Sequence, residues 1–213
     1  MMFRDRQDAG RRLAAHLGRY KAEHPAILAL PRGGVPVAAE IAAALDASLD
    51  LILVRKIGVP WQPELAMGAV VDGSEPLVVR NERVIRLTGV SSSEFEAICD
   101  AELAEIERRR RLYLGDRPRV EIAGRTAIVV DDGVATGATT RAALRATRMR
   151  QPQALILAVP VGPREVMAEM RREADEVICL EEPDDFGAIG LYYFDFRQID
   201  DEEVIKLLAR FPE

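Results

Sequence analysis

Residues 128–140 read IVVDDGVATGATT, an apolar run that ends in two adjacent carboxylates and leads into a loop rich in glycine and threonine. In open parallel sheets, ligands bind where strands end at their carboxyl edge and loops lead into helices. Asp131 and Asp132 stand at such a point. Two neighbouring carboxylates repel each other and resist burial unless something donates to them. The hydroxyls of a ribose would do so, and a divalent cation would help.

The loop after the acids has the composition of an anion site. Gly133 and Gly137 allow unusual backbone angles. The N–H groups from about Ala135 to Thr139 can then converge on one anion at a helix N-terminus. Three hydroxyls add donors: Thr136, Thr139 and Thr140. The stretch therefore predicts a sugar-diol site beside a phosphate site. A simple capping turn would leave the acid pair unexplained.

Two other phosphate motifs are excluded. A Walker A loop needs a lysine, and residues 57–205 contain none. A dinucleotide fingerprint needs G-x-G-x-x-G after the first strand, and the segment RGGVPVAAE at 32–40 lacks it.

The rest of the chain alternates apolar, strand-like runs with helical patterns. This predicts an α/β fold with a mainly parallel, doubly wound sheet. Strands are expected at 26–31, 49–56, 124–132, 154–161 and 175–182. Helices are expected at 4–20, 36–46, 91–114, 138–150 and 163–174, with an amphipathic helix in the tail. Ser91 and Glu94 form the S-x-x-E capping box that opens the third of these. Residues 57–75 are expected to form a long mobile loop, followed by a small hairpin or meander.

Composition narrows the class of protein. At 213 residues the chain fits a single domain, and a net charge of −6 disfavours a general nucleic-acid binder. Cys99 and Cys179 lie far apart without a C-x-x-C pattern, which disfavours disulfides and zinc and fits a reducing compartment. No segment approaches the ~18–20 apolar residues of a membrane span. The chain is therefore expected to be cytoplasmic, with no membrane partner.

The stretch VVDDGVATGATT at 129–140 resembles, almost throughout, the phosphoribosyl-pyrophosphate (PRPP) motif of type I phosphoribosyltransferases. Gly133 departs from that motif, because the position usually holds a larger apolar residue. The resemblance covers roughly residues 20–200, and the segment PELAMGAV is most similar to a predicted subgroup without an established acceptor. It implies an α/β core at about 20–182, a hood from the chain termini at about 1–20 and 183–213, and closure of the 57–75 loop over the site.

The resemblance also implies a role for particular residues. Asp131 and Asp132 would be catalytic, binding the ribose hydroxyls and, through water or substrate, Mg²⁺. The ribose and 5′-phosphate would be held by these acids and by Gly133, Val134, Ala135, Thr136, Gly137, Ala138, Thr139 and Thr140. Pyrophosphate would be held by Arg32, Gly33, Gly34, Arg55 and Lys56, of which Arg32 and Lys56 would also be catalytic. Arg55 and Lys56 could instead be a solvated strand end.

The acceptor is expected to be a nitrogenous base, with Phe186 or Tyr192 as a stacking face, although core packing explains either aromatic equally well. Hypoxanthine–guanine enzymes carry an aspartate where this chain has Ala135. That particular type is disfavoured, and adenine-, xanthine- and orotate-type relatives are compatible.

Two other functions stay open at this stage. The chain could be a PRPP-sensing regulator without catalysis, in which the basic run ERRRRLYLGDRPR at 107–119 touches nucleic acid, although a solvated helix face explains such a run better. It could also be a scaffold with a vestigial site. A homodimer is compatible with the resemblance, and no apolar stripe demands it.

Overall fold

Five short strands form a parallel sheet in the order β2-β1-β6-β7-β8. The structure is a computed structural model that describes residues 2–73 and 76–211. The strands are β1 (Ala26–Ala29), β2 (Ser48–Leu51), β6 (Thr126–Val130), β7 (Ala154–Val161) and β8 (Glu176–Glu181). Every residue of β1 and β6 is buried, as in strands covered on both faces. The predicted α/β fold with a parallel, doubly wound sheet is confirmed.

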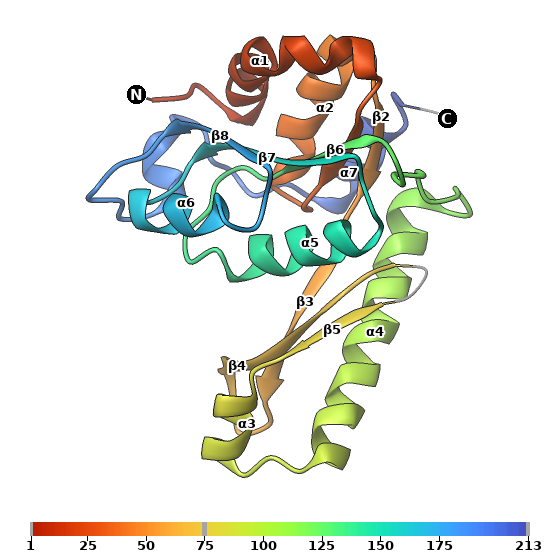
Figure 1. Cartoon of the computed structure of the whole chain (residues 1–213), viewed down its shortest axis with the longest axis vertical. Coiled ribbons are helices and arrows are strands. Elements are labelled where there is room, and N and C mark those ends of the chain that lie inside the picture. The colour runs from red at the N-terminus through yellow and green to blue at the C-terminus, as the bar shows by residue number, and fades with distance from the viewer. Residues whose placement is uncertain (1, 74–75, 212–213) are drawn as a thin grey trace.

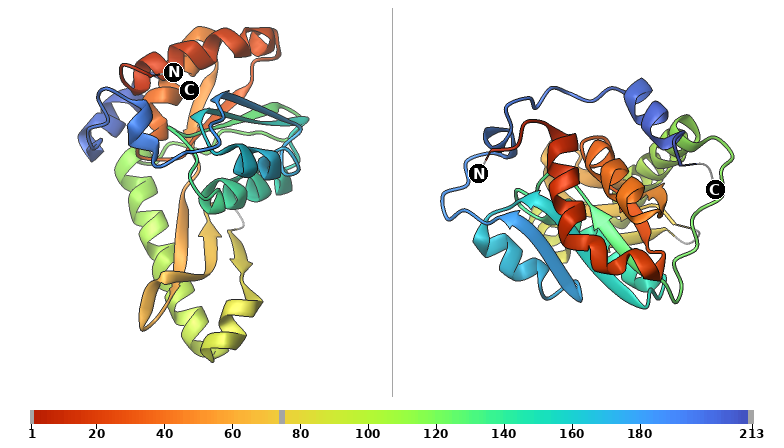
Figure 2. Two further views of the ribbon diagram at one scale, coloured as in Figure 1. Left: turned by 90° about the vertical axis from the view of Figure 1, so that its left-hand side faces the viewer. Right: turned by 90° about the horizontal axis from the view of Figure 1, so that it is seen from above.

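Helices cover both faces of this sheet (Figure 2). One face carries α1 (Arg6–Leu17) and α2 (Gly34–Leu45), and the other carries α5 (Ala138–Met149) and α6 (Arg164–Met170). The side chains of successive strand residues point toward opposite faces of the sheet. Ile27 and Ile128 pack with the first pair of helices, whereas Leu28 and Val129 pack with the second.

A second, antiparallel sheet projects from the parallel one together with a long helix (Figure 1). The sheet consists of β3 (Val54–Val59), β4 (Gln62–Val71) and β5 (Leu77–Arg80). Two helices follow it in the chain, α3 (Glu82–Thr88) and the long α4 (Ser92–Leu114). We call residues 54–114 the arm and the rest of the described chain the body. The capping box of Ser91 and Glu94 is present at the start of α4, as predicted.

The structure corrects two predictions in this region. Residues 49–56 are two strands in two sheets rather than one strand. Residues 57–71 of the predicted loop lie in β3, β4 and the turn that joins them, while residues 74 and 75 of that loop lie outside the described chain. The segment folds because Ile57, Val59 and Met67 are fully buried with the residues of α4. Whether the arm moves over the site stays a prediction.

A buried ion-pair cluster fastens the arm to the body. Arg110 of α4 lies 3.3 Å from a carboxylate oxygen of Asp50 in β2 and 3.3 Å from one of Asp72, which follows β4. Asp72 also accepts a 2.8 Å hydrogen bond from the N–H of Leu53, at the bend between β2 and β3. All three charged groups are buried. This cluster holds the bend at which the chain leaves the parallel sheet. No local sequence pattern at 49–56 predicts that bend.

The two terminal segments lie side by side, with the tail running around one edge of the body (Figure 2). The N–H of Phe3 donates to Tyr192 O at 2.8 Å, and the N–H of Phe194 donates to Phe3 O at 2.9 Å. The remaining elements are η1 (Gly18–Glu23), η2 (Ile189–Tyr192) and α7 (Asp201–Leu208). Helix α1 packs on one face of the parallel sheet and is therefore part of the body's layers. The predicted hood formed by the two chain termini stays a prediction. No helix in the described residues combines the length and apolar character needed to cross a membrane.

Candidate functional site

Two loops meet at the carboxyl edge of the parallel sheet, because β1 and β6 pair in register with Ala29 opposite Val130. We call residues 31–34 the glycine loop and residues 131–137 the acid loop. A Cβ on Gly33 would lie 2.0 Å from Asp132 Oδ2, and one on Gly34 would lie 2.7 Å from Val130 O. Only glycine permits this approach, so the predicted pyrophosphate and ribose segments do lie against each other. The peptide bond that joins Pro31 to Arg32 is cis.

Asp131 is partly exposed at this edge, and its Oδ1 accepts a 2.8 Å hydrogen bond from the N–H of Asp132. Although part of Asp131 reaches the surface, desolvation of its carboxyl by the surrounding protein, followed by the neighbouring Asp132 carboxylate, raises the pKa of Asp131 well above its usual range. Hydroxyl donors or a cation would stabilise the ionised form of an acid in this position, as the sequence led us to expect.

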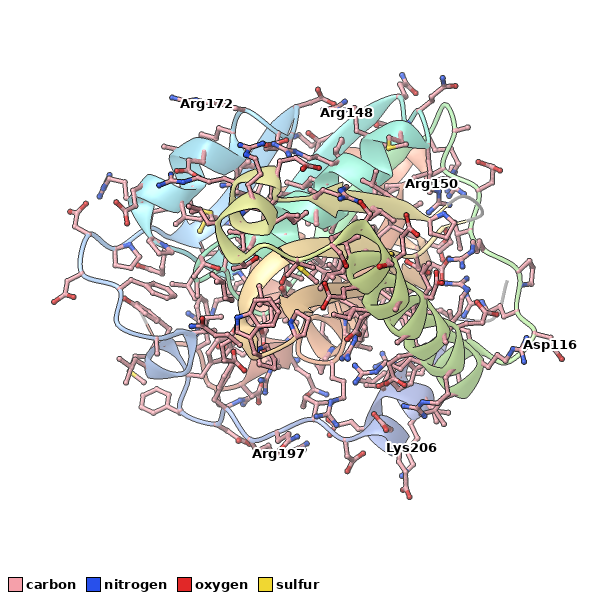
Figure 3. The ribbon with its side chains drawn as sticks, turned by 90° about the horizontal axis from the view of Figure 1, so that it is seen from below. Asp116, Arg148, Arg150, Arg172, Arg197 and Lys206 are labelled. Carbon is pink, nitrogen blue, oxygen red and sulfur yellow. The ribbon has the colours of Figure 1, made fainter. Side chains whose placement is uncertain are left out.

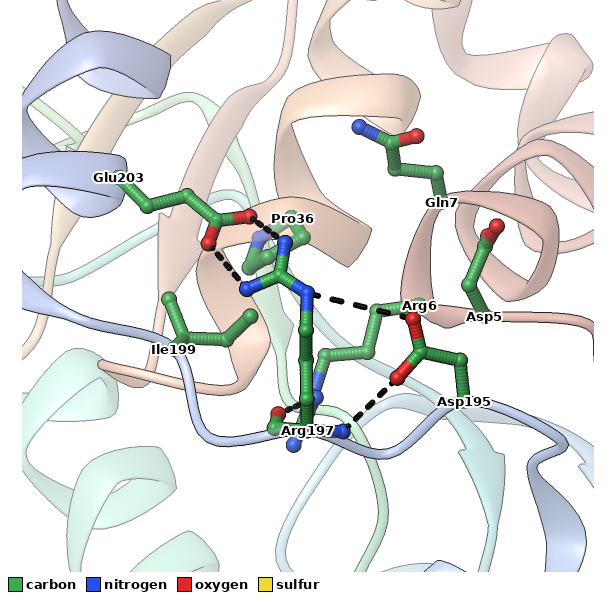
Figure 4. A pocket seen from close by; sticks show the side chains of 8 residues that line it. All are labelled: Asp5, Arg6, Gln7, Pro36, Asp195, Arg197, Ile199 and Glu203. Atoms are coloured by element: carbon green, nitrogen blue, oxygen red, sulfur yellow. Dashed lines mark hydrogen bonds and ion pairs between the residues drawn. The ribbon is translucent and has the colours of Figure 1, made fainter.

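Asp132 is buried and already has a cationic partner. Its Oδ2 lies 2.7 Å from Arg6 Nε of α1, and both side chains are almost wholly covered. Arg6 also donates to Arg197 O at 2.8 Å, as Figure 4 shows. The hydroxyl of Tyr193 donates to Asp132 O at 2.6 Å. The two adjacent acids therefore have different surroundings. Of the two, only Asp131 lines the cavity described below.

Sequence reasoning missed Arg6 and Tyr193. No motif marks either residue, because their partner lies 126 and 61 positions away in the chain. Arg6 stands among other arginines at the N-terminal end of a helix, and Tyr193 is one of several aromatics in the tail. The only available signal was that a buried acid pair needs donors.

The N-terminus of α5 closes the acid loop. Its N-cap, Gly137, has a φ of +75°, and no side chain caps the helix. The first-turn N–H groups are thus available to an anion, which the helix dipole also favours. Four loop residues are exposed: Ala135, Thr136, Ala138 and Thr139. Four others are buried: Gly133, Val134, Gly137 and Thr140. The Thr140 side chain is therefore less accessible than the sequence suggested.

The departure at Gly133 has a structural reason. A Cβ there would lie 2.7 Å from Ile189 Cγ2 of the tail. Ile189 occupies the space that a larger residue would need.

A small cavity of about 70 Å³ lies between the two loops and the part of the arm nearest the body. Its lining residues are Leu30, Pro31, Leu53, Val54, Arg55, Ile106, Arg109, Asp131 and Thr139. Arg55, a predicted pyrophosphate ligand, lies here and donates to Glu102 at 2.5 Å. Arg109 was not predicted, and its Nε donates to Glu105 at 2.7 Å. The cavity thus brings together an acid, a hydroxyl and two arginines.

The other two predicted cations do not line this cavity. Arg32 is about one-third exposed, with Nη1 3.6 Å from an oxygen of Asp201 in α7. Lys56 does not line the cavity, and its Nζ pairs with the exposed Glu64 of β4 at 3.1 Å. Successive residues of a strand point to opposite faces, so Arg55 and Lys56 cannot both face one cavity.

Phe186 and Tyr192 stack on each other, with ring centroids 5.7 Å apart and planes inclined by 19°. Both are partly buried. The expectation that one of them stacks on a base stays a prediction.

The basic run of α4 is committed to ion pairs within the chain. Arg108 and Arg109 share Glu105, Arg110 lies in the buried cluster, and Arg111 is 3.6 Å from Glu107. Arg148, labelled on the body in Figure 3, is likewise paired, with Asp175 at 2.8 Å. The predicted nucleic-acid surface therefore gains no support.

Comparisons with known proteins agree with this geometry. A family model described as a phosphoribosyl transferase domain matches residues 4–197. Two curated proteins of Mycobacterium tuberculosis strains, each named "Putative phosphoribosyl transferase", are 44% identical over 209 residues, covering 98% of this chain and 47% of theirs. This chain thus spans about half their length. A crystal structure of a Thermus thermophilus protein has a TM-score of 0.82 and 40% identity, covering 100% of both chains.

Proposed function

The chain belongs to the phosphoribosyl transferase domain family, and we propose that it transfers a 5-phosphoribosyl group from PRPP to a nitrogenous base with release of pyrophosphate. The observation that carries this proposal is the contact of the glycine loop with the acid loop, where Gly33 leaves no room for a side chain beside Asp132. That contact supports a pyrophosphate site next to a site for a sugar phosphate.

Each part of PRPP has a matching protein group. The uncapped N-terminus of α5 would hold the 5′-phosphate, and Asp131 would accept hydrogen bonds from the ribose hydroxyls. The N–H of Gly33, with Arg32 and Arg55, would hold the pyrophosphate, whereas the N–H of Gly34 already donates to Leu30 O at 3.0 Å.

The reaction needs positioning and charge neutralisation rather than a covalent nucleophile. The bond from C1 of the ribose to pyrophosphate breaks while the bond from C1 to the base nitrogen forms, and the pyrophosphate leaves with the electron pair. Arginines near the leaving group stabilise the charge that develops on it. Removing one such donor typically costs ~10²–10³-fold in rate.

Mg²⁺ fits the residues present, although the described part of the chain forms no protein cage for it. The described residues contain no group of three or more histidine, cysteine or acidic side chains that could hold a metal ion. Mg²⁺ commonly keeps several waters and binds one or two carboxylates together with substrate phosphates. Asp131 is the carboxylate at hand, because Asp132 is occupied by Arg6. When bound, Mg²⁺ would neutralise charge on the pyrophosphate.

The residue at position 135 narrows the class of acceptor base. Ala135 is exposed in the acid loop where an aspartate would handle the base proton in a hypoxanthine–guanine enzyme. We therefore expect a base that needs no acid at this position. A cytoplasmic location and a homodimer stay predictions.

The experiment that tests the proposal is incubation with PRPP, Mg²⁺ and a panel of nitrogenous bases, followed by mass spectrometry of the products. A nucleoside monophosphate from one base, with stoichiometric pyrophosphate, supports the enzyme and names the acceptor. Binding of PRPP without product from any base supports the non-catalytic sensor instead.

A further inference from the structure

We propose that Arg109 of α4 binds the pyrophosphate of PRPP together with Arg55, so that the arm supplies a second cation to the site from a rigid helix. This inference rests on the proposed function and names a residue that the motifs do not mark.

The cavity geometry is the first argument. Arg55 and Arg109 both line the cavity that also contains Pro31 of the glycine loop, Asp131 and Thr139. A ligand that spans the glycine loop and the acid loop would therefore lie beside the two arginines. Paired arginines suit a polyphosphate, because each presents several N–H donors in a planar fork.

The hydrogen bonding of Arg109 leaves it able to bind an anion. Its Nε donates to Glu105, and within the described parts of the chain no group accepts from its terminal nitrogens. Glu105 also receives two hydrogen bonds from Arg108, at 2.7 and 3.0 Å. Both arginines hold the pKa of Glu105 down, at about 2. If Arg109 turns to a phosphate, Arg108 still compensates the charge of Glu105.

The position of Arg109 is set by rigid structure. It lies in a helix of 23 residues that begins with a capping box. The next residue, Arg110, lies in the buried cluster that ties the arm to the body. Arg109 thus supplies the second cation that the sequence assigned to Lys56, whose side chain pairs with Glu64 on the arm.

Arg108 gives a matched control, because it pairs with the same glutamate, is 61% exposed and does not line the cavity. Arg109→Gln, Arg109→Lys and Arg108→Gln would be titrated calorimetrically with three probes in Mg²⁺: PRPP, inorganic pyrophosphate and ribose 5-phosphate. Thermal unfolding by circular dichroism would check that each variant folds.

Arg109→Gln is expected to weaken PRPP and pyrophosphate binding by about ten- to a hundred-fold, the range for a hydrogen bond to a charged group. Ribose 5-phosphate, which lacks the pyrophosphate, should bind within two-fold of wild type. Arg108→Gln should leave all three affinities within two-fold, and Arg109→Lys should recover part of the loss.

Two results would overturn the inference and are distinguishable. If the wild type binds all three probes and Arg109→Gln matches Arg108→Gln, Arg109 is no ligand although the proposed function stands. If the folded wild type binds none of the probes, the proposed function fails and the inference fails with it.

Discussion

Replacing Arg6 with methionine tests whether the ion pair to Asp132 organises the site. The change keeps most of the apolar stem of the side chain and removes the charge. Arg6 Nε lies 2.7 Å from Asp132 Oδ2, with side chains only 9% and 12% exposed. Without Arg6, Asp132 must keep an unpaired buried charge or take up a proton.

The expected loss of stability can be estimated from these contacts. Removing one partner of a buried ion pair costs about 3–5 kcal/mol, because the other charge is left uncompensated. Losing the hydrogen bond to Arg197 O adds about 1 kcal/mol. For a chain of this size, each kcal/mol lowers the melting temperature by roughly 2–4 °C. We therefore expect the melting temperature of Arg6→Met to fall by at least about 8 °C.

The assays are thermal unfolding, which gives the melting temperature, and urea unfolding, which gives the free energy, both followed by far-ultraviolet circular dichroism. The single tryptophan, Trp61, is 62% exposed on the arm and would report poorly on the body. Arg11→Met is the control, because Arg11 of the same helix pairs with Glu40 at 3.3 Å and is half-exposed, so its loss should cost under about 1 kcal/mol. Adding Asp132→Asn to Arg6→Met should recover part of the loss, since no buried charge then remains. Equal, small losses in Arg6→Met and Arg11→Met would refute the reasoning.

Three further predictions concern the two loops and the arm. Because burial and a neighbouring carboxylate raise the pKa of Asp131, its stabilising contribution is present at low pH and is lost as pH rises; Asp131→Asn should therefore increase the free energy of unfolding at pH 7 in metal-free urea titrations, and a decrease would contradict this. Gly33→Ala would place a Cβ 2.0 Å from an oxygen of Asp132, so calorimetry should show PRPP binding weakened at least about ten-fold, whereas Gly18→Ala, with open space around it, should bind normally. Lys56→Ala should change the calorimetric PRPP affinity less than two-fold, because that side chain pairs on the exposed arm, and a large loss would restore it to the site.

Much of the fold was readable from local patterns. The strand at 154–161 has the predicted bounds, because both ends are marked by a change from apolar to polar or helix-starting residues. The helix from Ser92 begins where the capping box predicts. In such segments, hydrophobic periodicity and capping residues act within a few positions of the structure they determine.

The errors came from contacts between distant residues. The run at 49–56 reads as one buried strand, and it divides because Asp72 and Arg110 hold the bend from positions far along the chain. The 57–75 segment reads as a loop because of its glycines and prolines, whereas its apolar residues pair across a hairpin and pack on α4. Such tertiary effects override local propensity.

The candidate site divides in the same way. The resemblance assigned both loops to one ligand, and the structure brings them into contact at the ends of neighbouring strands. Arg6 and Arg109 lie in arginine-rich helices, so composition could not single them out. Lys56 was assigned to the site because the resemblance implies a basic residue where the second strand ends, whereas in the structure its side chain pairs with Glu64, so its role in the site stays a prediction.

The measurement that tests the central claim most directly is a calorimetric titration of the folded wild-type chain with PRPP, first with Mg²⁺ and then with a chelator. The geometry predicts saturable binding at one site per chain, weakened when the chelator removes Mg²⁺ and lost in Asp131→Asn. Absence of PRPP binding in Mg²⁺ by a chain that unfolds cooperatively would show that the two loops do not form a PRPP site.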